Sequence, residues 1–116
     1  MKNSESTRYF SDKQEKQVAR IINGYQTANS GAGHFVKGDV VNKNAGILCE
    51  CKCVMSEKDS ISVKKSWIDK SKEEAKSTRL SNTCIAINFK PDGENYFIID
   101  EKLMAYLIEC LEREES

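Results

Sequence analysis

Residues 37–53 read KGDVVNKNAGILCECKC, and this stretch decides the fold. Two runs rich in apolar residues, 38–43 and 47–54, flank the sequence Asn-Ala-Gly at 44–46, which is typical of a hairpin turn. We therefore predict two antiparallel strands over these ranges.

The second predicted strand carries charged side chains on one face. Glu50 and Lys52 share a face because side chains alternate along a strand, and the paired strand can bring Asp39 beside them. Carboxylates suit Mg²⁺, which binds through one or two of them and keeps water ligands. A lysine beside such an ion can orient water or offset charge on a phosphate. The pattern predicts phosphodiester hydrolysis; the alternative is a surface ion pair worth about 0–1 kcal/mol.

The five cysteines are expected to be small buried residues. Cys49, Cys51 and Cys53 alternate with the charged side chains and so fall on the opposite face, against a helix. Their spacing also differs from the Cys-x₂-Cys pairs of zinc sites. Cys84 and Cys110, in a predicted strand and the last predicted helix, are expected to be core thiols.

The remaining elements follow from periodicity. A capping pattern at Ser11 and Gln14 predicts a helix over residues 11–23, after a loose segment 1–10 and before a loop over 25–37. A second helix, 62–78, has Val63, Trp67, Ile68, Ser71 and Ala75 at helical spacing. Strands are predicted at 83–89 and 96–99, and Asp100 is expected to cap a last helix with an apolar stripe, Leu103, Met104, Leu107, Ile108 and Leu111, that frays from Glu112.

The order helix, strand, strand, helix, strand, strand, helix predicts an α/β fold with a mixed β-sheet core flanked by helices. The length of 116 residues fits one domain, placed at 11–112, with an acidic tail at 113–116. No stretch approaches the roughly 20 apolar residues that a membrane span needs. The N-terminus lacks the apolar core of a secretory signal, so a cytoplasmic protein without a membrane partner is expected.

Charge does not identify a partner. The chain has 18 basic and 18 acidic residues. Residues 1–99 hold 16 basic and 12 acidic residues, whereas residues 100–116 hold two and six. The acidity is therefore concentrated at the C-terminal end, and the balance gives no support by itself to a nucleic-acid partner.

The chain resembles the PD-(D/E)xK nuclease superfamily. The resemblance rests on Gly38-Asp39-Val40 and on Glu50-Cys51-Lys52 at the end of an apolar strand, with ten residues between Asp39 and Glu50. In detail it resembles the small Holliday-junction resolvases of archaea and phages, which have a glutamate in the first helix and a Ser-Gly loop ahead of the Gly-Asp strand. Glu15 and Ser30-Gly31 stand at those places. The resemblance implies a restriction-endonuclease-like fold.

The same resemblance implies roles for individual residues. Asp39 and Glu50 would bind Mg²⁺ or Mn²⁺, with the backbone carbonyl of Cys51 as a third ligand. Lys52 would position the attacking water, and Glu15 would complete the metal shell. The implied DNA contacts are Ser30, Gly31, Lys37, Lys64 and Lys65.

The implied activity is a divalent-metal-dependent DNA endonuclease, most specifically a resolvase of four-way junctions. Two symmetric nicks need two sites, so a C2 homodimer is expected, formed through residues 104–111 or 96–99. If the chain is phage-encoded, it would act in the host cytoplasm.

Other interpretations stay open. The chain could be a repair, flap or restriction-like nuclease of the same fold, or a non-catalytic nucleic-acid-binding module. Glu15, Lys64 and Lys65 could be solvated helix residues, Ser30-Gly31 a simple turn, and His34 an inert surface residue.

Overall fold

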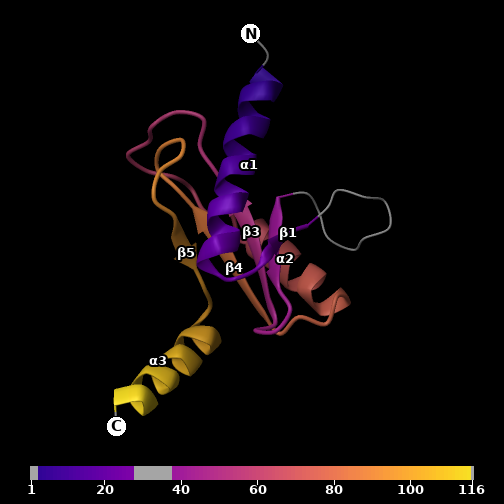
Figure 1. The fold of residues 1–116 in the computed structure, drawn as a ribbon, viewed down its shortest axis with the longest axis vertical. Coiled ribbons are helices and arrows are strands. Elements are labelled where there is room, and N and C mark those ends of the chain that lie inside the picture. The colour runs from indigo at the N-terminus through magenta and orange to yellow at the C-terminus, as the bar shows by residue number, and fades with distance from the viewer. Residues whose placement is uncertain (1–2, 28–37, 116) are drawn as a thin grey trace.

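The computed structural model describes residues 3–27 and 38–115, and its centre is a five-stranded β-sheet (Figure 1). The strands are β1 (Tyr25–Gln26), β2 (Asp39–Asn42), β3 (Ile47–Lys52), β4 (Asn82–Ile87) and β5 (Tyr96–Ile98). They lie in the order β1-β2-β3-β4-β5, with β3 and β4 parallel and the other neighbours antiparallel. The helices are α1 (Asn3–Ile21), α2 (Lys65–Ser77) and α3 (Glu101–Glu115). The predicted mixed sheet flanked by helices is confirmed.

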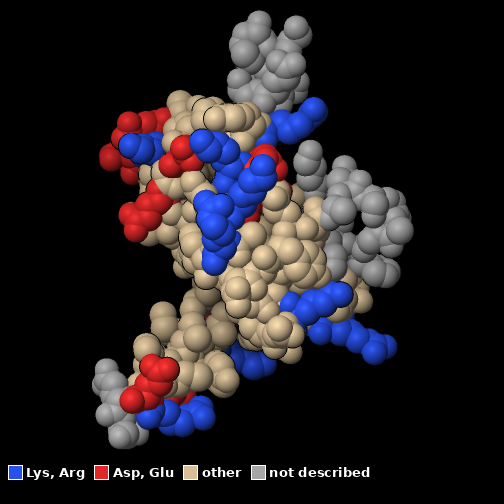
Figure 2. All heavy atoms as spheres, in the orientation of Figure 1, with Lys and Arg blue, Asp and Glu red and all other residues tan. Residues whose placement is uncertain are grey.

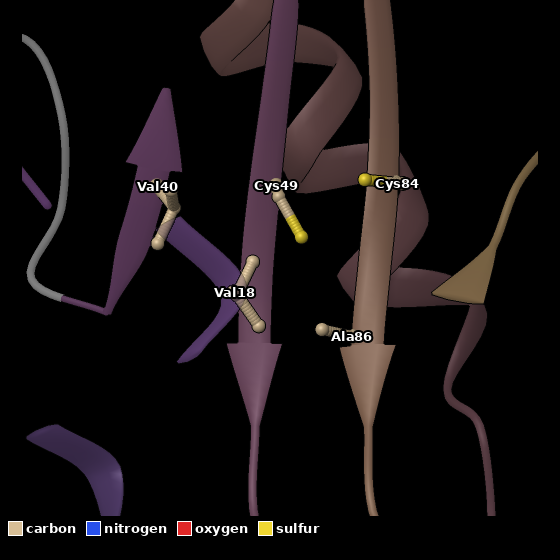
Figure 3. Close-up of a cluster of buried hydrophobic side chains, with 5 residues drawn as sticks. All are labelled: Val18, Val40, Cys49, Cys84 and Ala86. Carbon is tan, nitrogen blue, oxygen red and sulfur yellow. The ribbon is translucent and has the colours of Figure 1, made fainter. Parts of the chain in front are cut away.

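Helices α1 and α2 cover opposite faces of the sheet. A parallel strand pair needs a crossover connection, and α2 provides it between β3 and β4. The buried side chains on the α1 face are Val18, Val40, Cys49, Cys84 and Ala86 (Figure 3). Those on the α2 face are Val41, Leu48 and Ala75. Two thin apolar layers thus hold the sheet between the helices.

The predicted hairpin joins β2 to β3. Gly46 has a φ of 69°, a conformation that glycine adopts at little cost, and its amide donates to the Lys43 carbonyl at 3.2 Å. The Asn42 side chain accepts a hydrogen bond from the amide of Ala45 at 2.9 Å. The turn sets a register in which Asp39 is paired with Glu50.

The first helix begins earlier than predicted. The capping interpretation of Ser11 is wrong, because α1 starts at Asn3 and the Ser11 hydroxyl lies 3.6 Å from the Cys53 sulfur. Neither glycine nor proline occurs before Gly24. Once Val18 is packed on the sheet, each further residue adds a helical hydrogen bond without a new nucleation cost.

The predicted loop after α1 contains a short strand, β1, which the predicted element order lacks. Two residues are too few to show alternation in a sequence. Gly24 allows this chain segment to approach β2, since a Cβ atom at Gly24 would lie 2.3 Å from the Val41 carbonyl oxygen.

Helix α2 also differs at its start. It begins at Lys65 rather than Ser62, and Val63, which the spacing placed in the core, is exposed. The C-terminal part of the predicted sheet fits more closely, because β5 lies within its predicted range and β4 begins one residue before its own.

Helix α3 begins as predicted and ends later. The Asp100 carboxylate accepts a hydrogen bond from the Leu103 amide at 2.9 Å, which confirms the cap. Fraying from Glu112 is not seen, because the helix continues to Glu115. Figure 1 shows α3 projecting away from the sheet. Leu103 is buried, whereas Met104, Leu107, Ile108 and Leu111 are each 41–57% exposed.

Within the described residues, no helix is both long enough and apolar enough to cross a membrane.

Candidate functional site

Asp39 and Glu50 lie opposite each other on β2 and β3. The amide of Cys51 donates to the Gly38 carbonyl at 3.0 Å, so Gly38 and Cys51 form the hydrogen-bonded pair of the ladder. Asp39 and Glu50 are then a non-hydrogen-bonded pair, the type in which Cα atoms are about 4.5 Å apart and side chains lie closest. Asp39 is 3% exposed. The structure thus brings the two predicted carboxylates together on the α2 face of the sheet.

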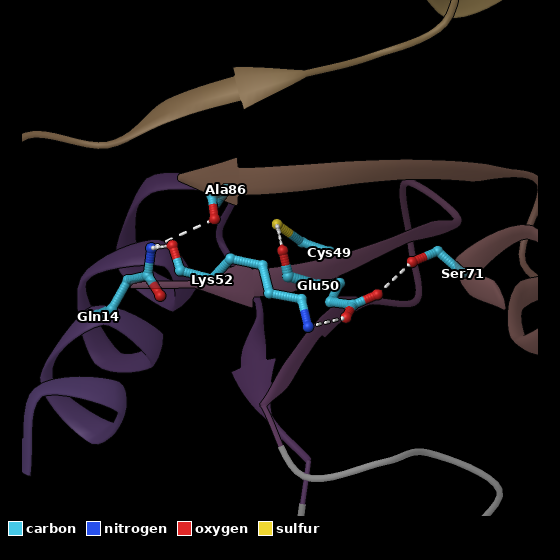
Figure 4. Close-up of polar contacts among 6 residues, drawn as sticks. All are labelled: Gln14, Cys49, Glu50, Lys52, Ser71 and Ala86. Carbon is cyan, nitrogen blue, oxygen red and sulfur yellow. Dashed lines mark hydrogen bonds and ion pairs between the residues drawn. The ribbon is translucent and has the colours of Figure 1, made fainter. Parts of the chain in front are cut away.

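Lys52 lies on the same face and contacts Glu50. Its ammonium nitrogen is 3.0 Å from Glu50 Oε2 (Figure 4). The ammonium also lies 4.8 Å from the centre of the Trp67 ring, in a cation–π contact. The Lys52 side chain is 37% exposed, against 16% for Glu50. The Lys52 side chain is thus the more accessible member of the pair.

Helix α2 supplies the second contact to Glu50. The hydroxyl of Ser71, which is 1% exposed, donates to Glu50 Oε1 at 2.8 Å (Figure 4). Each carboxylate oxygen of Glu50 therefore has its own partner. A hydrogen bond to an ionised group is stronger than one between neutral groups, so this contact fixes the carboxylate firmly.

The backbone on the β2 side of the site depends on glycine. Gly38 has a φ of 105°, which proline cannot adopt and which strains any residue with a Cβ atom. The carbonyl of Asp39 accepts hydrogen bonds from the amide and hydroxyl of Thr27, at 3.1 and 3.3 Å. These contacts tie Asp39 to the segment that follows β1.

Glu15 reaches the same end of β2 from the other face. It is 5% exposed, and Gln26 Nε2 donates to its Oε1 at 3.1 Å. A Cβ atom at Gly38 would lie 3.9 Å from Glu15 Oε2. Asp39 lies on the α2 face, because its neighbour Val40 packs on the α1 face. The Glu15 carboxylate lies beside Gly38, the residue that precedes Asp39.

The structure describes only some of the residues that the resemblance implies as DNA contacts. Ser30, Gly31, Lys37 and also His34 lie outside the described residues. Lys64 and Lys65 stand at the start of α2, and the Lys65 ammonium pairs with Asp69 at 2.9 Å. Since Trp67 is only two residues further along, this helix end lies on the Lys52 side of the site. On the face drawn in Figure 2, basic and acidic side chains are intermixed near α1.

The cysteines of β3 lie where alternation predicted them. Cys49 is fully buried on the α1 face, and Cys51 packs against the same cluster. Hydrogen bonding with Cys51, reinforced by burial, raises the pKa of the Cys49 thiol. Hydrogen bonding with Cys49, together with burial, raises the pKa of Cys84. The thiols of Cys49 and Cys84 therefore stay protonated at neutral pH and pack as small apolar side chains in the core.

The residues present fit a magnesium-type ion through a small donor set. In the described part of the chain, no three Asp, Glu, His or Cys side chains lie close enough to hold a metal ion together. Two carboxylates and water are nevertheless the usual ligands of Mg²⁺ in phosphate-processing sites. Asp39 and Glu50 form such a pair. The backbone of Cys51 points toward β2, the strand that carries Asp39.

Sequence reasoning missed the two α2 contacts of the site. Ser71 and Trp67 were recognised only as parts of the stripe that packs α2 on the sheet. A serine within an otherwise apolar stripe was the available signal, because a buried hydroxyl needs a partner. Its partner could not be read from the sequence, since that depends on where α2 crosses β3.

Comparison with known protein families, with curated proteins and with solved structures finds no match to this chain.

Proposed function

We propose that the protein is a divalent-metal-dependent DNA endonuclease. One observation carries the proposal: Asp39 and Glu50 are directly paired across β2 and β3, with Lys52 on the same face and 3.0 Å from Glu50. This is the arrangement in which a lysine and two acids can act on one phosphodiester. It also agrees with the resemblance to PD-(D/E)xK nucleases.

The residues would divide the work as follows. Asp39 and Glu50 would hold Mg²⁺ or Mn²⁺, with the Cys51 carbonyl as a further oxygen ligand. When bound, the ion supplies a more acidic water and offsets negative charge on the phosphate. Lys52, charged and partly exposed, orients the attacking water or stabilises charge that grows on the phosphate oxygens. Glu15, which lies beside Gly38, would complete the metal shell from α1 through a second ion or a bound water.

The substrate we propose is a four-way DNA junction, cut by a homodimer. One chain offers one Asp39–Glu50 pair, whereas resolving a junction takes two symmetric cuts. Four of the exposed apolar side chains of α3, Met104, Leu107, Ile108 and Leu111, support a self-association surface. Contiguous exposed apolar patches are typical of interaction sites. Lys64 and Lys65, at the Lys52 side of the site, would contact phosphates.

Cleavage of a labelled synthetic junction and of its matched linear duplex tests the proposal. Each DNA is incubated with Mg²⁺, Mn²⁺ or EDTA and with wild-type protein, Asp39→Asn, or the control Glu73→Gln, which changes an exposed carboxylate on α2. We expect paired, metal-dependent cuts on the junction that disappear in Asp39→Asn and persist in the control.

The other outcomes are equally informative. Equal cutting of both DNAs would keep the nuclease and remove the junction specificity. Binding without cutting under any ion would overturn the enzyme and favour the non-catalytic nucleic-acid-binding module.

A further inference from the structure

Helix α2 places two side chains against the charged residues of β3. Trp67 and Ser71 are four residues apart, so they share one face of the helix. Trp67 contacts Lys52, and Ser71 contacts Glu50. One helix face therefore meets both members of the Glu50–Lys52 pair.

These contacts determine how the pair is oriented. Ser71 holds Glu50 Oε1 while Lys52 holds Oε2, at 2.8 and 3.0 Å, so the carboxylate group cannot rotate without losing one partner. The Lys52 stem has several rotatable bonds and would sample many rotamers in water. Contacts with a carboxylate on one side and an indole ring on the other select one of them.

We propose that Ser71 and Trp67 are positioning residues of the active site, Ser71 for Glu50 and Trp67 for Lys52. The inference rests on the proposed nuclease function and deepens it. Ser71 keeps the glutamate turned toward Asp39 for ion binding. The Trp67 ring keeps the lysine ammonium beside the carboxylate pair.

Ser71→Ala tests the first half. We expect the dissociation constant for Mn²⁺, measured without DNA from the EPR signal of free Mn²⁺, to rise about 10-fold, as is usual for loss of an outer hydrogen bond to a metal ligand. The Mg²⁺ concentration for half-maximal cleavage should rise in parallel, with the KM for DNA unchanged. A structural role alone would lower the folded fraction and leave the Mn²⁺ constant of the folded protein where it was.

The control for Ser71→Ala is Ser77→Ala. It removes a hydroxyl from the same helix, but one that is exposed and bonded to the Glu74 carbonyl. Unchanged Mn²⁺ binding in Ser71→Ala, or an equal change in Ser77→Ala, would overturn the role of Ser71.

Trp67 reports on its own contact, because it is the one tryptophan of the chain. Removing the ammonium with Lys52→Met should shift the fluorescence emission of Trp67, whereas Lys70→Met, on an exposed part of the same helix, should not. Trp67→Phe keeps an aromatic face and should retain most of kcat, whereas Trp67→Leu should lose about 10-fold. Unshifted emission in Lys52→Met, or wild-type kcat in Trp67→Leu, would contradict the role of Trp67.

Failure of the positioning proposal can be told from failure of the nuclease proposal. Cleavage that depends on Asp39 but not on Ser71 or Trp67 would contradict only the positioning roles of Ser71 and Trp67. Absence of cleavage by the wild type with either ion would contradict the nuclease proposal. It would also contradict any role of these contacts in catalysis. The emission shift still shows in that case whether Lys52 lies on Trp67.

Discussion

Replacing Lys52 with methionine should separate catalysis from stability at this site. Methionine keeps much of the length of the lysine stem and removes the charge. Two interactions are lost: an ion pair at 3.0 Å with one partner 37% exposed, and a cation–π contact at 4.8 Å. A partly exposed pair contributes about 0.5–1 kcal/mol and the cation–π contact about the same, so the free energy of unfolding should fall by about 1–2 kcal/mol.

The effect on cleavage should be far larger. Loss of a group that stabilises charge only in the transition state costs roughly 10²- to 10³-fold in kcat. Urea unfolding followed by far-UV circular dichroism measures the first quantity, because Trp67 emission is itself expected to change. A loss of 1–2 kcal/mol lowers the urea midpoint by roughly 0.5–1 M.

The matched control for the stability measurement alone is Lys65→Met, which breaks an ion pair with Asp69 that is far more exposed. It should change the free energy of unfolding by less than about 0.5 kcal/mol. A loss above about 3 kcal/mol in Lys52→Met would make Lys52 a structural ion-pair member. Cleavage within threefold of wild type would refute its place in the reaction.

Two predictions concern the C-terminal region. The pKa of Asp100 is held below its ordinary value, first by the Lys72 ammonium at 2.6 Å and then by the Leu103 amide. Ionised Asp100 therefore stabilises the fold above about pH 4. This contribution is lost as the pH falls through the lowered pKa. Asp100→Asn keeps a capping side chain and should cost about 0.5 kcal/mol at pH 7 in urea unfolding, and less as the pH is lowered through the pKa of Asp100. A cost that does not change with pH would contradict this. Leu107→Glu combined with Leu111→Glu should convert a dimer to a monomer in light scattering after gel filtration, at unchanged helix content; a monomeric wild type would remove α3 as the dimer interface.

The sequence by itself determined the local part of the site. The Asn-Ala-Gly turn sets the register of β2 and β3, and that register alone places Asp39 opposite Glu50. Strand alternation, a purely local property, puts Lys52 beside Glu50 and sends Cys49 to the other face. The cap of α3 at Asp100 is equally local.

Only the tertiary structure decided which helix meets which strand face. The contact of Ser71 with Glu50 joins residues 21 positions apart and exists because α2 crosses back over β3. The approach of Glu15 to Gly38 joins α1 to the start of β2 and exists because α1 packs on the sheet. The two residues of β1 have the same origin. Pairing with β2 makes them a strand, and no local pattern records that contact.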